Sequence, residues 1–249
     1  MTKRENKLLG LLFFNQGYTN LILQINEAIT AKKSCSIITP TTEILGACLD
    51  DQAIYGIISE AQILLPDSVT LILLSRLLRK AITRRLTGID TIYELGRQTT
   101  RQYKVYLLGA QQSVLDQTVK RAGELFPAFK IVGCQHGYFD AKTETDKVIK
   151  HINDSGAEIL FIGMGFPRQE RFISEYGKQI LAPVKITVGG SYDVISGHLK
   201  RAPRWMQNSG LEWLFRLLQE PTRIFRMSLI PWYLLKLLSA EIQHKYDRH

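Results

Sequence analysis

The stretch AEILFIGMGFPRQER, residues 157–171, decides the fold. Its first half is an apolar run without regular polar alternation, which is typical of a strand covered on both faces of a sheet. Two glycines follow, and Pro167 then suits the first turn of a helix. We therefore expect a strand that passes directly into a helix, with free backbone N–H groups near Gly165 and Phe166.

The same combination of apolar run and helical pattern recurs along the chain. Apolar runs occupy residues 34–39, 61–66, 104–109, 129–133, 157–163 and 184–190. Helical patterns lie at about 18–32, 42–59, 70–80, 90–102, 111–125, 142–154 and 167–180. This alternation predicts an α/β, Rossmann-like layered fold with a mostly parallel sheet. Ligands of such folds bind beyond the C-terminal ends of the strands.

The composition favours an anionic partner and a reducing compartment. The 249 residues carry a formal net charge of +9, which favours nucleic acid, an anionic membrane or phosphate-bearing substrates. The cysteines form no CxxC pair and the histidines no metal-binding pattern, so we expect neither disulfides nor a bound metal. The apolar run LLGLLFF (8–14) is too short for a signal peptide, and no run reaches the ~20 residues of a membrane span. We therefore expect a cytoplasmic protein.

From residue 200 onward the composition changes. All three tryptophans lie here, and nine Lys/Arg against four Asp/Glu give this tail a charge of about +5. We expect a core over residues 1–199 and a helical, basic-aromatic C-terminal appendage over residues 200–249, with its helices broken at Pro221 and Pro231. Aromatic and cationic side chains beside aliphatic runs favour docking on the inner, anionic face of the cell membrane. The alternative is packing on the chain's own core or on a neighbouring subunit.

The opening stretch contains a partial glycine fingerprint. GMGFPR (163–168) resembles GxGxxG, but Arg168 stands where the third glycine should be, so a dinucleotide loop is poorly supported. Gln169 and Glu170 follow in the first turn of the expected helix and point toward the strand ends. The alternative is an ordinary helix start with solvated charges.

Two further strand ends carry polar side chains. In LLPDSVT (64–70), Asp67 is either the N-cap of a helix that starts near Thr70 or a carboxylate placed to accept a proton from a substrate hydroxyl. In IITPTTEI (37–44), Thr42 is a plausible N-cap, whereas Thr39 lies at the strand tip and could bind a ligand.

The last strand end is VGGSYDVISG (188–197). Gly189 and Gly190 permit a close backbone approach to a ligand, and Asp193 could accept hydrogen bonds from a sugar or base. The alternative is a tight turn with a capping Asp. Ligand sites of this fold class are assembled from several strand ends, and the sequence predicts one such site from Thr39, Asp67, Gln169 and Asp193.

From about residue 35 to the C-terminus the chain resembles the WecG/TagA/CpsF family of glycosyltransferases (family 26). The resemblance is carried by long and specific stretches and covers roughly four-fifths of the chain. These stretches are LLPDS (64–68), RLTGID (85–90), VYLLGA (105–110), FKIVGCQHGYF (129–139), INDSGAEILFIGMGFPRQE (152–170), VGGSYDVISGHLKRAPRWM (188–206) and GLEWLFRLLQEPTRIFR (210–226).

The resemblance implies an inverting hexosyltransferase. The implied donor is a UDP-sugar, with N-acetylmannosamine or a related hexose as the sugar, and the implied acceptor is an undecaprenyl-diphosphate-linked N-acetylglucosamine. The products of the family serve wall teichoic acid, enterobacterial common antigen, capsule or exopolysaccharide. A different UDP-hexose and a different lipid-linked acceptor are the alternative. No cofactor is implied, and we expect metal-independent chemistry because the sequence contains no D-x-D motif.

The family's functional residues carry over to particular positions of this chain. Asp67 matches the proposed base, Thr39 and Thr41 match a T-x-N motif, and Gln169 matches the Gln of P-K-Q-E. The family's C-terminal arginines, which could neutralise the leaving diphosphate, fall on Arg216, Arg223 and Arg226. We predict that substrate binding involves Thr41, Gly109, Gly163, Gly165, Arg168, Gly189, Gly190 and Asp193.

Two positions depart from the family pattern. Thr41 replaces Asn, which removes an amide donor, and Ser68 replaces the Gly of LPDG. Both changes bear on the acceptor or the exact sugar rather than on the reaction type. For the arginines, the alternative role is a basic helix face that only meets lipid headgroups.

The same residues give less support to three other functions. An NAD-dependent oxidoreductase needs a full glycine fingerprint early in the chain, which SCSIITPTTE (34–43) lacks. A nucleic-acid binder needs cations interleaved with stacking aromatics on one platform, whereas here they lie beside aliphatic runs. A non-enzymatic protein that binds anionic ligands is the third rival. A dimer or trimer through the core is plausible.

Overall fold

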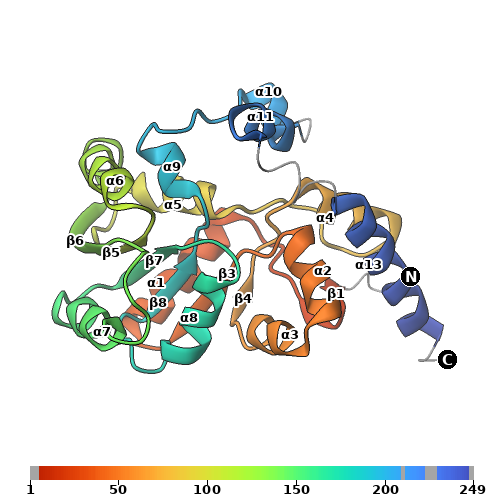
Figure 1. Ribbon diagram of the computed structural model, residues 1–249, viewed down its shortest axis with the longest axis horizontal. Coiled ribbons are helices and arrows are strands. Elements are labelled where there is room, and N and C mark those ends of the chain that lie inside the picture. The colour runs from red at the N-terminus through yellow and green to blue at the C-terminus, as the bar shows by residue number, and fades with distance from the viewer. Residues whose placement is uncertain (1–5, 209–210, 222–228, 247–249) are drawn as a thin grey trace.

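The computed structural model describes residues 6–208, 211–221 and 229–246. Within them, six parallel strands form one sheet in the order β4-β3-β8-β7-β5-β6 (Figure 1). The strands are β3 Cys35–Ile38, β4 Ile63–Leu64, β5 Tyr103–Gly109, β6 Phe129–Gln135, β7 Ile159–Gly163 and β8 Val184–Thr187. All six predicted strands and their parallel arrangement are confirmed.

Alternate residues of the central strands enter different layers of the core. Phe161 of β7 belongs to the cluster that contains residues of α1 Tyr18–Thr30, α5 Gly88–Gly96 and α6 Gln112–Leu125. Leu160 and Ile162 belong to the cluster packed against α7 Thr145–Asp154 and α8 Arg168–Tyr176. A strand with helices on both faces has no solvated side, which explains why its sequence shows no polar alternation.

One predicted helix is divided in two. The pattern at 42–59 predicts a single helix, but the structure contains α2 Thr42–Asp50 and α3 Gln52–Ser59. Asp51 between them is extended, with φ −136°, and its Oδ1 accepts hydrogen bonds from the N–H groups of Ala53 (2.8 Å) and Ile54 (3.4 Å). The carboxylate therefore starts a new helix as its N-cap.

The N-terminal apolar run forms a hairpin that pattern reading did not anticipate. β1 Lys7–Leu8 pairs antiparallel with β2 Leu11–Leu12, and Leu9 and Gly10 make the turn with positive φ angles. The hairpin covers a core cluster that includes Leu8, Leu11 and residues of α2, α3 and α4 Val69–Leu77. It therefore belongs to the folded core.

The C-terminal part, which we call the C-terminal segment, contains α10 Arg204–Asn208, α11 Glu212–Gln219 and α13 Ile230–Tyr246. Both predicted breaks lie at helix boundaries, because α11 ends at Gln219 before Pro221 and Pro231 lies in the first turn of α13, where a missing N–H costs little. Among the described residues, no helix has the length and apolarity to cross a membrane. The division of the chain at residue 199 stays a prediction.

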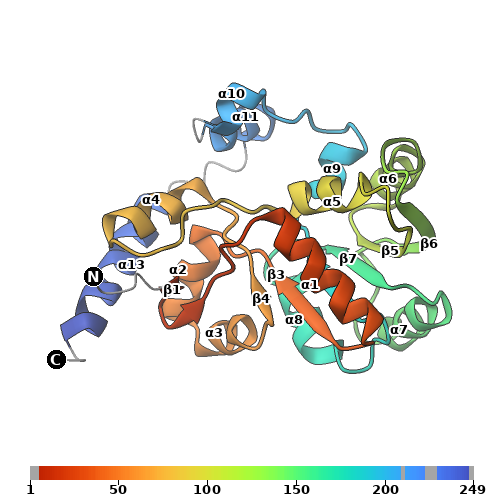
Figure 2. The same ribbon diagram turned by 180° about the vertical axis from the view of Figure 1, so that it is seen from behind.

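α13 lies beside α2 and α4 in both views (Figures 1 and 2). Leu237 is fully buried in the cluster shared with α2 and α4, and Lys80 pairs with Glu241 at 2.9 Å. The Tyr233 ring packs directly on Gly46, where an added Cβ would meet it at 2.1 Å. α13 is therefore held to the core by a close helix contact and an ion pair.

Candidate active site

A cavity of about 930 Å³ lies at the C-terminal ends of the strands. Its wall includes residues that follow β3, β4, β7 and β8, which is where the sequence places a ligand site. Of the predicted site residues, the lining contains Thr39, Thr41, Asp67, Gly163, Gly165, Arg168, Gln169, Gly189, Gly190 and Asp193. The structure thus brings together most of the predicted positions.

Helix N-termini converge on this cavity. The residues that cap or begin α2, α4, α5, α6 and α8 all lie in its wall; they are Thr41, Ser68, Thr87, Gln111 and Arg168. The first turn of a helix has unpaired N–H groups and the positive end of the helix dipole. A cavity surrounded by such ends favours an anion, above all a phosphate.

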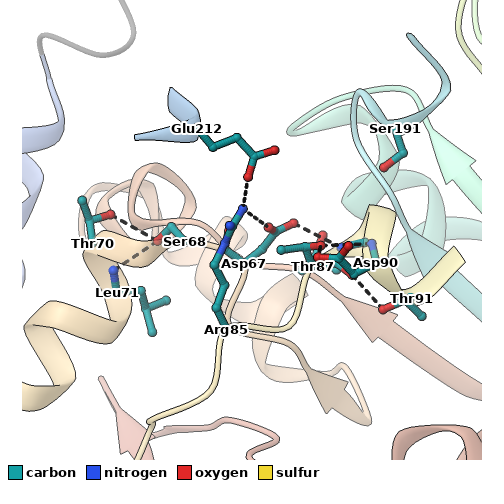
Figure 3. Close-up of polar contacts among 12 residues, drawn as sticks. Asp67, Ser68, Thr70, Leu71, Arg85, Thr87, Asp90, Thr91, Ser191 and Glu212 are labelled. Atoms are coloured by element: carbon teal, nitrogen blue, oxygen red, sulfur yellow. Dashed lines mark hydrogen bonds and ion pairs between the residues drawn. The ribbon is translucent and has the colours of Figure 1, made fainter. Parts of the chain in front are cut away.

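Asp67 is not the N-cap of α4. The N-cap of α4 is Ser68, whose Oγ accepts the Leu71 N–H at 3.2 Å, so the capping alternative for Asp67 is wrong. Asp67 lies in the cavity wall, with its Oδ2 accepting the Gly88 N–H at 3.3 Å (Figure 3). Its side chain is about a quarter exposed, so a substrate hydroxyl can reach the carboxylate.

Arg85 lies between Asp67 and the C-terminal segment. Its Nη2 is 4.0 Å from Asp67 Oδ1 and 2.6 Å from an oxygen of Glu212 in α11 (Figure 3). Burial would lower the pKa of Arg85, but the carboxylates of Asp67 and Glu212 outweigh it and raise the pKa. The guanidinium therefore stays charged and links the base candidate to the C-terminal segment.

The threonines of the first strand end are engaged within the protein. Thr39 is buried, its N–H donates to Thr187 Oγ1 at 3.1 Å, and its hydroxyl lies 3.2 Å from the Thr187 carbonyl oxygen. Thr41, not Thr42, caps α2, because its Oγ1 accepts the Ile44 N–H at 3.4 Å. Thr42 instead contacts the Ser68 hydroxyl at 2.9 Å. Thr39 thus joins β3 to β8 at the cavity wall.

Gln169 is held at both ends of its amide. Its Oε1 accepts the Gly189 N–H at 3.1 Å, and its Nε2 donates to Glu170 Oε1 at 2.8 Å. Both side chains are almost completely buried, and burial raises the pKa of Glu170. Gly189 has φ +51°, a backbone conformation that favours glycine. Gln169 therefore fixes the loop after β8 against the start of α8.

Arg168 projects to another part of the wall. Its guanidinium donates to the Gly137 carbonyl and lies over the Tyr138 ring, 5.4 Å from the ring centroid. The glycine at 163 is required sterically, since an added Cβ would meet the Tyr192 ring at 2.7 Å. Gly109, itself a described residue, is not part of the lining; an added Cβ there would lie 2.3 Å from the Gly163 oxygen, so its role is close packing of β5 on β7.

The last strand end forms a short helix. Gly189 and Gly190 form a tight turn closed by the Ser191 N–H, which donates to the Val188 carbonyl at 3.1 Å, and α9 Ser191–Ile195 follows directly. The N-cap of α9 is Gly190, so Asp193 is not the cap; it lies in the first turn of α9 and in the cavity wall. The structure describes no side chain for the three predicted arginines of the tail. Arg216 belongs to α11, with its side chain outside the described atoms, and Arg223 and Arg226 lie outside the described residues.

Pattern reading missed several lining residues. Arg85 and Thr87 lie in RLTGID, and Tyr138 lies in FKIVGCQHGYF. Both stretches carry the family resemblance and could have identified these residues as candidates. Glu212 and Trp213 line the cavity from α11, and the stretch GLEWLFRLLQEPTRIFR (210–226), which also carries the resemblance, contains both. In the part of the chain that the structure describes, no group of three or more His, Cys, Asp or Glu could hold a metal ion.

Comparison with known proteins gives a consistent result. The sequence model described as "Glycosyl transferase WecG/TagA/CpsF family" matches residues 6–247. A Bacillus subtilis protein named N-acetylglucosaminyldiphosphoundecaprenol N-acetyl-beta-D-mannosaminyltransferase is 33% identical over 94% of this chain and 91% of its own length. Proteins of the same name from Bacillus spizizenii (32% identical, 84% and 80%) and Staphylococcus aureus (30% identical, 94% and 92%) are also similar.

Proposed function

The chain belongs to the WecG/TagA/CpsF family of glycosyltransferases, and we propose that it moves N-acetylmannosamine or a related hexose from a UDP donor to an undecaprenyl-diphosphate-linked N-acetylglucosamine. The reaction would serve the synthesis of a bacterial cell-surface polymer. The names of its relatives at about 30% identity support this donor and acceptor. The enzyme class follows from the family.

One observation carries the proposal: a carboxylate lies in a cavity surrounded by helix N-termini. Asp67 can accept a proton, and the starts of α2, α4, α5, α6 and α8 favour a diphosphate. A UDP-sugar carries a diphosphate, and its transfer to a hydroxyl requires a base. The cavity volume of about 930 Å³ is large enough for a nucleotide sugar.

The proposed reaction is a single displacement at the anomeric carbon. The acceptor hydroxyl oxygen forms a bond to that carbon while the bond to the UDP oxygen breaks, and the hydroxyl proton passes to Asp67. Such assistance by a positioned base is typically worth ~10²–10⁴-fold in rate. One displacement inverts the anomeric configuration, so an α-linked donor gives a β-linked product.

The leaving UDP needs positive charge near its diphosphate. Carboxylates outnumber guanidinium groups among the described side chains of the lining. The guanidinium groups belong to Arg85 and Arg168, and the carboxylates belong to Glu43, Asp67, Asp193, Glu212 and Glu220. Helix ends supply part of the compensation. We assign the rest to Arg216, Arg223 and Arg226, which follow Glu212 in the C-terminal segment. We propose that these groups suffice for the leaving UDP and that the reaction needs no metal.

A lipid-linked acceptor is met at a bilayer surface, so the enzyme is proposed to act peripherally on the cytoplasmic face of the membrane. Large apolar side chains of the C-terminal segment support this: Trp205, Trp213, Leu218, Trp232 and Leu235 are all about half exposed or more. Together with the basic residues of the tail, they suit an anionic bilayer interface.

The two departures from the family motifs support a second donor as an alternative. Thr41 and Ser68 each use their hydroxyl as a helix cap at the cavity wall. Their side chains therefore present different groups to a substrate from the Asn and Gly of the family pattern. This difference favours a donor that is a UDP-hexose other than UDP-N-acetylmannosamine.

The proposal is tested by UDP release from a panel of UDP-sugars, with a short-chain, diphosphate-linked N-acetylglucosaminyl lipid as acceptor and EDTA present. We expect release with one sugar, dependent on the acceptor, and unchanged by added magnesium or manganese. UDP binding without transfer from any donor would contradict the proposed reaction. Transfer only after metal addition would contradict its metal independence.

A further inference from the structure

α4 exposes large apolar side chains although it belongs to the core. Leu71, Ile72 and Leu74 face inward and are buried, whereas Leu73 and Leu77 are 54% and 68% exposed. Residues four apart lie on the same side of a helix, so Leu73 and Leu77 form one outward apolar stripe. A soluble surface gains nothing from such a stripe, which indicates a partner.

Cations flank this stripe. Arg76 lies between the two leucines in sequence, and Arg79 follows α4; both side chains are exposed. Neither forms an ion pair with any residue that the structure describes. Exposed leucines beside unpaired arginines are the composition of a helix that lies in the interface of an anionic bilayer.

α13, which lies beside α4, also exposes large apolar side chains. Its inward side buries Leu237 and Glu241, and its outward side exposes Trp232 by 57% and Leu235 by 64%. α4 and α13 lie side by side (Figures 1 and 2), share one core cluster and are joined by the Lys80–Glu241 pair. The two helices are therefore presented to a partner as one unit.

Both helices start at the cavity. Val69 and Thr70 in the first turn of α4, and Ile230 and Pro231 in the first turn of α13, belong to its lining. The exposed apolar residues follow within one or two turns of each helix. A bilayer that contacted these residues would lie beside the cavity mouth, where a membrane-bound acceptor has to deliver its sugar.

We propose that the outward sides of α4 and α13 together form a docking face for an anionic bilayer. Its apolar part is Leu73, Leu77, Trp232 and Leu235, and its cationic part is Arg76 and Arg79. The face thus extends beyond the C-terminal segment into the core. The inference rests on the proposed function for its purpose, the delivery of a lipid-linked acceptor, although membrane binding itself can be measured separately.

The test compares two double variants by co-sedimentation with vesicles of phosphatidylglycerol and phosphatidylcholine. Leu73→Ser/Leu77→Ser should weaken binding about tenfold, because two leucines no longer enter the bilayer. The control, Leu125→Ser/Leu181→Ser, changes exposed leucines on other parts of the surface and should bind as the unmodified chain does. Equal binding by both variants would overturn the proposal, with circular dichroism confirming that both fold.

Two further arms separate the possible causes. Arg76→Gln/Arg79→Gln should weaken binding to the anionic vesicles but not to pure phosphatidylcholine. Sedimentation equilibrium without lipid should show the same mass for all variants; dissociation of an oligomer by Leu73→Ser/Leu77→Ser would mean that the face binds a second copy, which overturns the proposal.

Transfer assays distinguish this inference from the proposed function. Leu73→Ser/Leu77→Ser should reduce transfer to a long-chain acceptor in vesicles and leave transfer to the short-chain soluble acceptor unchanged. If the unmodified chain fails with the soluble acceptor, the proposed function fails, while co-sedimentation still decides the docking face. An equal loss with both acceptors would contradict a docking role.

Discussion

The two sides of the cavity are built in different ways. The core side consists of strand ends and helix starts fixed by many hydrogen bonds, within helix caps (the Leu71 N–H donates to Ser68 Oγ) and between neighbouring strand ends (Thr39 with Thr187). The side formed by α11 and α13 is held by contacts between distant parts of the chain, above all Glu212 to Arg85 and Tyr233 on Gly46. The core can therefore position the base alone, whereas the C-terminal segment depends on a few contacts that single substitutions can remove.

The largest expected effect belongs to the core side. Asp67→Asn keeps an oxygen for the Gly88 N–H but cannot accept the substrate proton, so kcat should fall by about 10²–10⁴-fold. UDP binding, measured by calorimetry, should survive. Asp154→Asn, an exposed aspartate that pairs with Lys150, is the matched control. Loss of UDP binding in Asp67→Asn would mean that Asp67 is structural.

The next effect concerns the attachment of α13. In Gly46→Ala the new Cβ would overlap the Tyr233 ring, and relief of such a clash typically costs about 1–3 kcal/mol of folding stability. Gly56→Ala in α3 is the control, because its Cβ meets nothing within 4 Å and the better helix former should stabilise by about 0.5–1 kcal/mol. Urea denaturation measures both. Equal changes would show that α13 does not pack on Gly46 in solution.

A smaller effect is expected where the two sides meet. Glu212→Gln removes the charged partner of Arg85, and kcat/KM should fall about tenfold because the guanidinium loses its charge-assisted hydrogen bond beside Asp67. Glu124→Gln, an exposed position on α6, serves as the control. Unchanged kcat/KM in Glu212→Gln would separate α11 from the active site.

The smallest effect is a pH dependence of stability within the core. Burial raises the pKa of Glu170, so the folded state keeps this proton to a higher pH than the unfolded chain. The protonated carboxyl of Glu170 contributes its full stability below the ordinary pKa of 4.5, and this contribution is lost as pH rises through the higher pKa of the folded state. Glu170→Gln should therefore gain stability relative to the unmodified chain on going from about pH 4.5 to about pH 8. A difference in unfolding free energy that is the same at both pH values would contradict this.

The comparison also explains what the sequence could predict. Apolar runs locate all six strands, and Asp67 and Gln169 follow strand ends, so local pattern was sufficient for them. The Arg85–Glu212 contact joins residues 127 positions apart, and Thr39 contacts Thr187 across 148 positions; local periodicity carries no information on such pairs. The apolar spacing did not predict the division of the helix at Asp51, because this spacing continues through Asp51 while its carboxylate starts a new helix.

The central claim is that the core and the C-terminal segment form one active site, and a double-mutant cycle tests it most directly. kcat/KM for transfer would be measured for Arg85→Gln, Glu212→Gln and the double variant. If the two residues act as a unit, the loss in the double variant should be about tenfold smaller than the product of the single losses. Losses that multiply would contradict the claim, because Arg85 and Glu212 would then act independently.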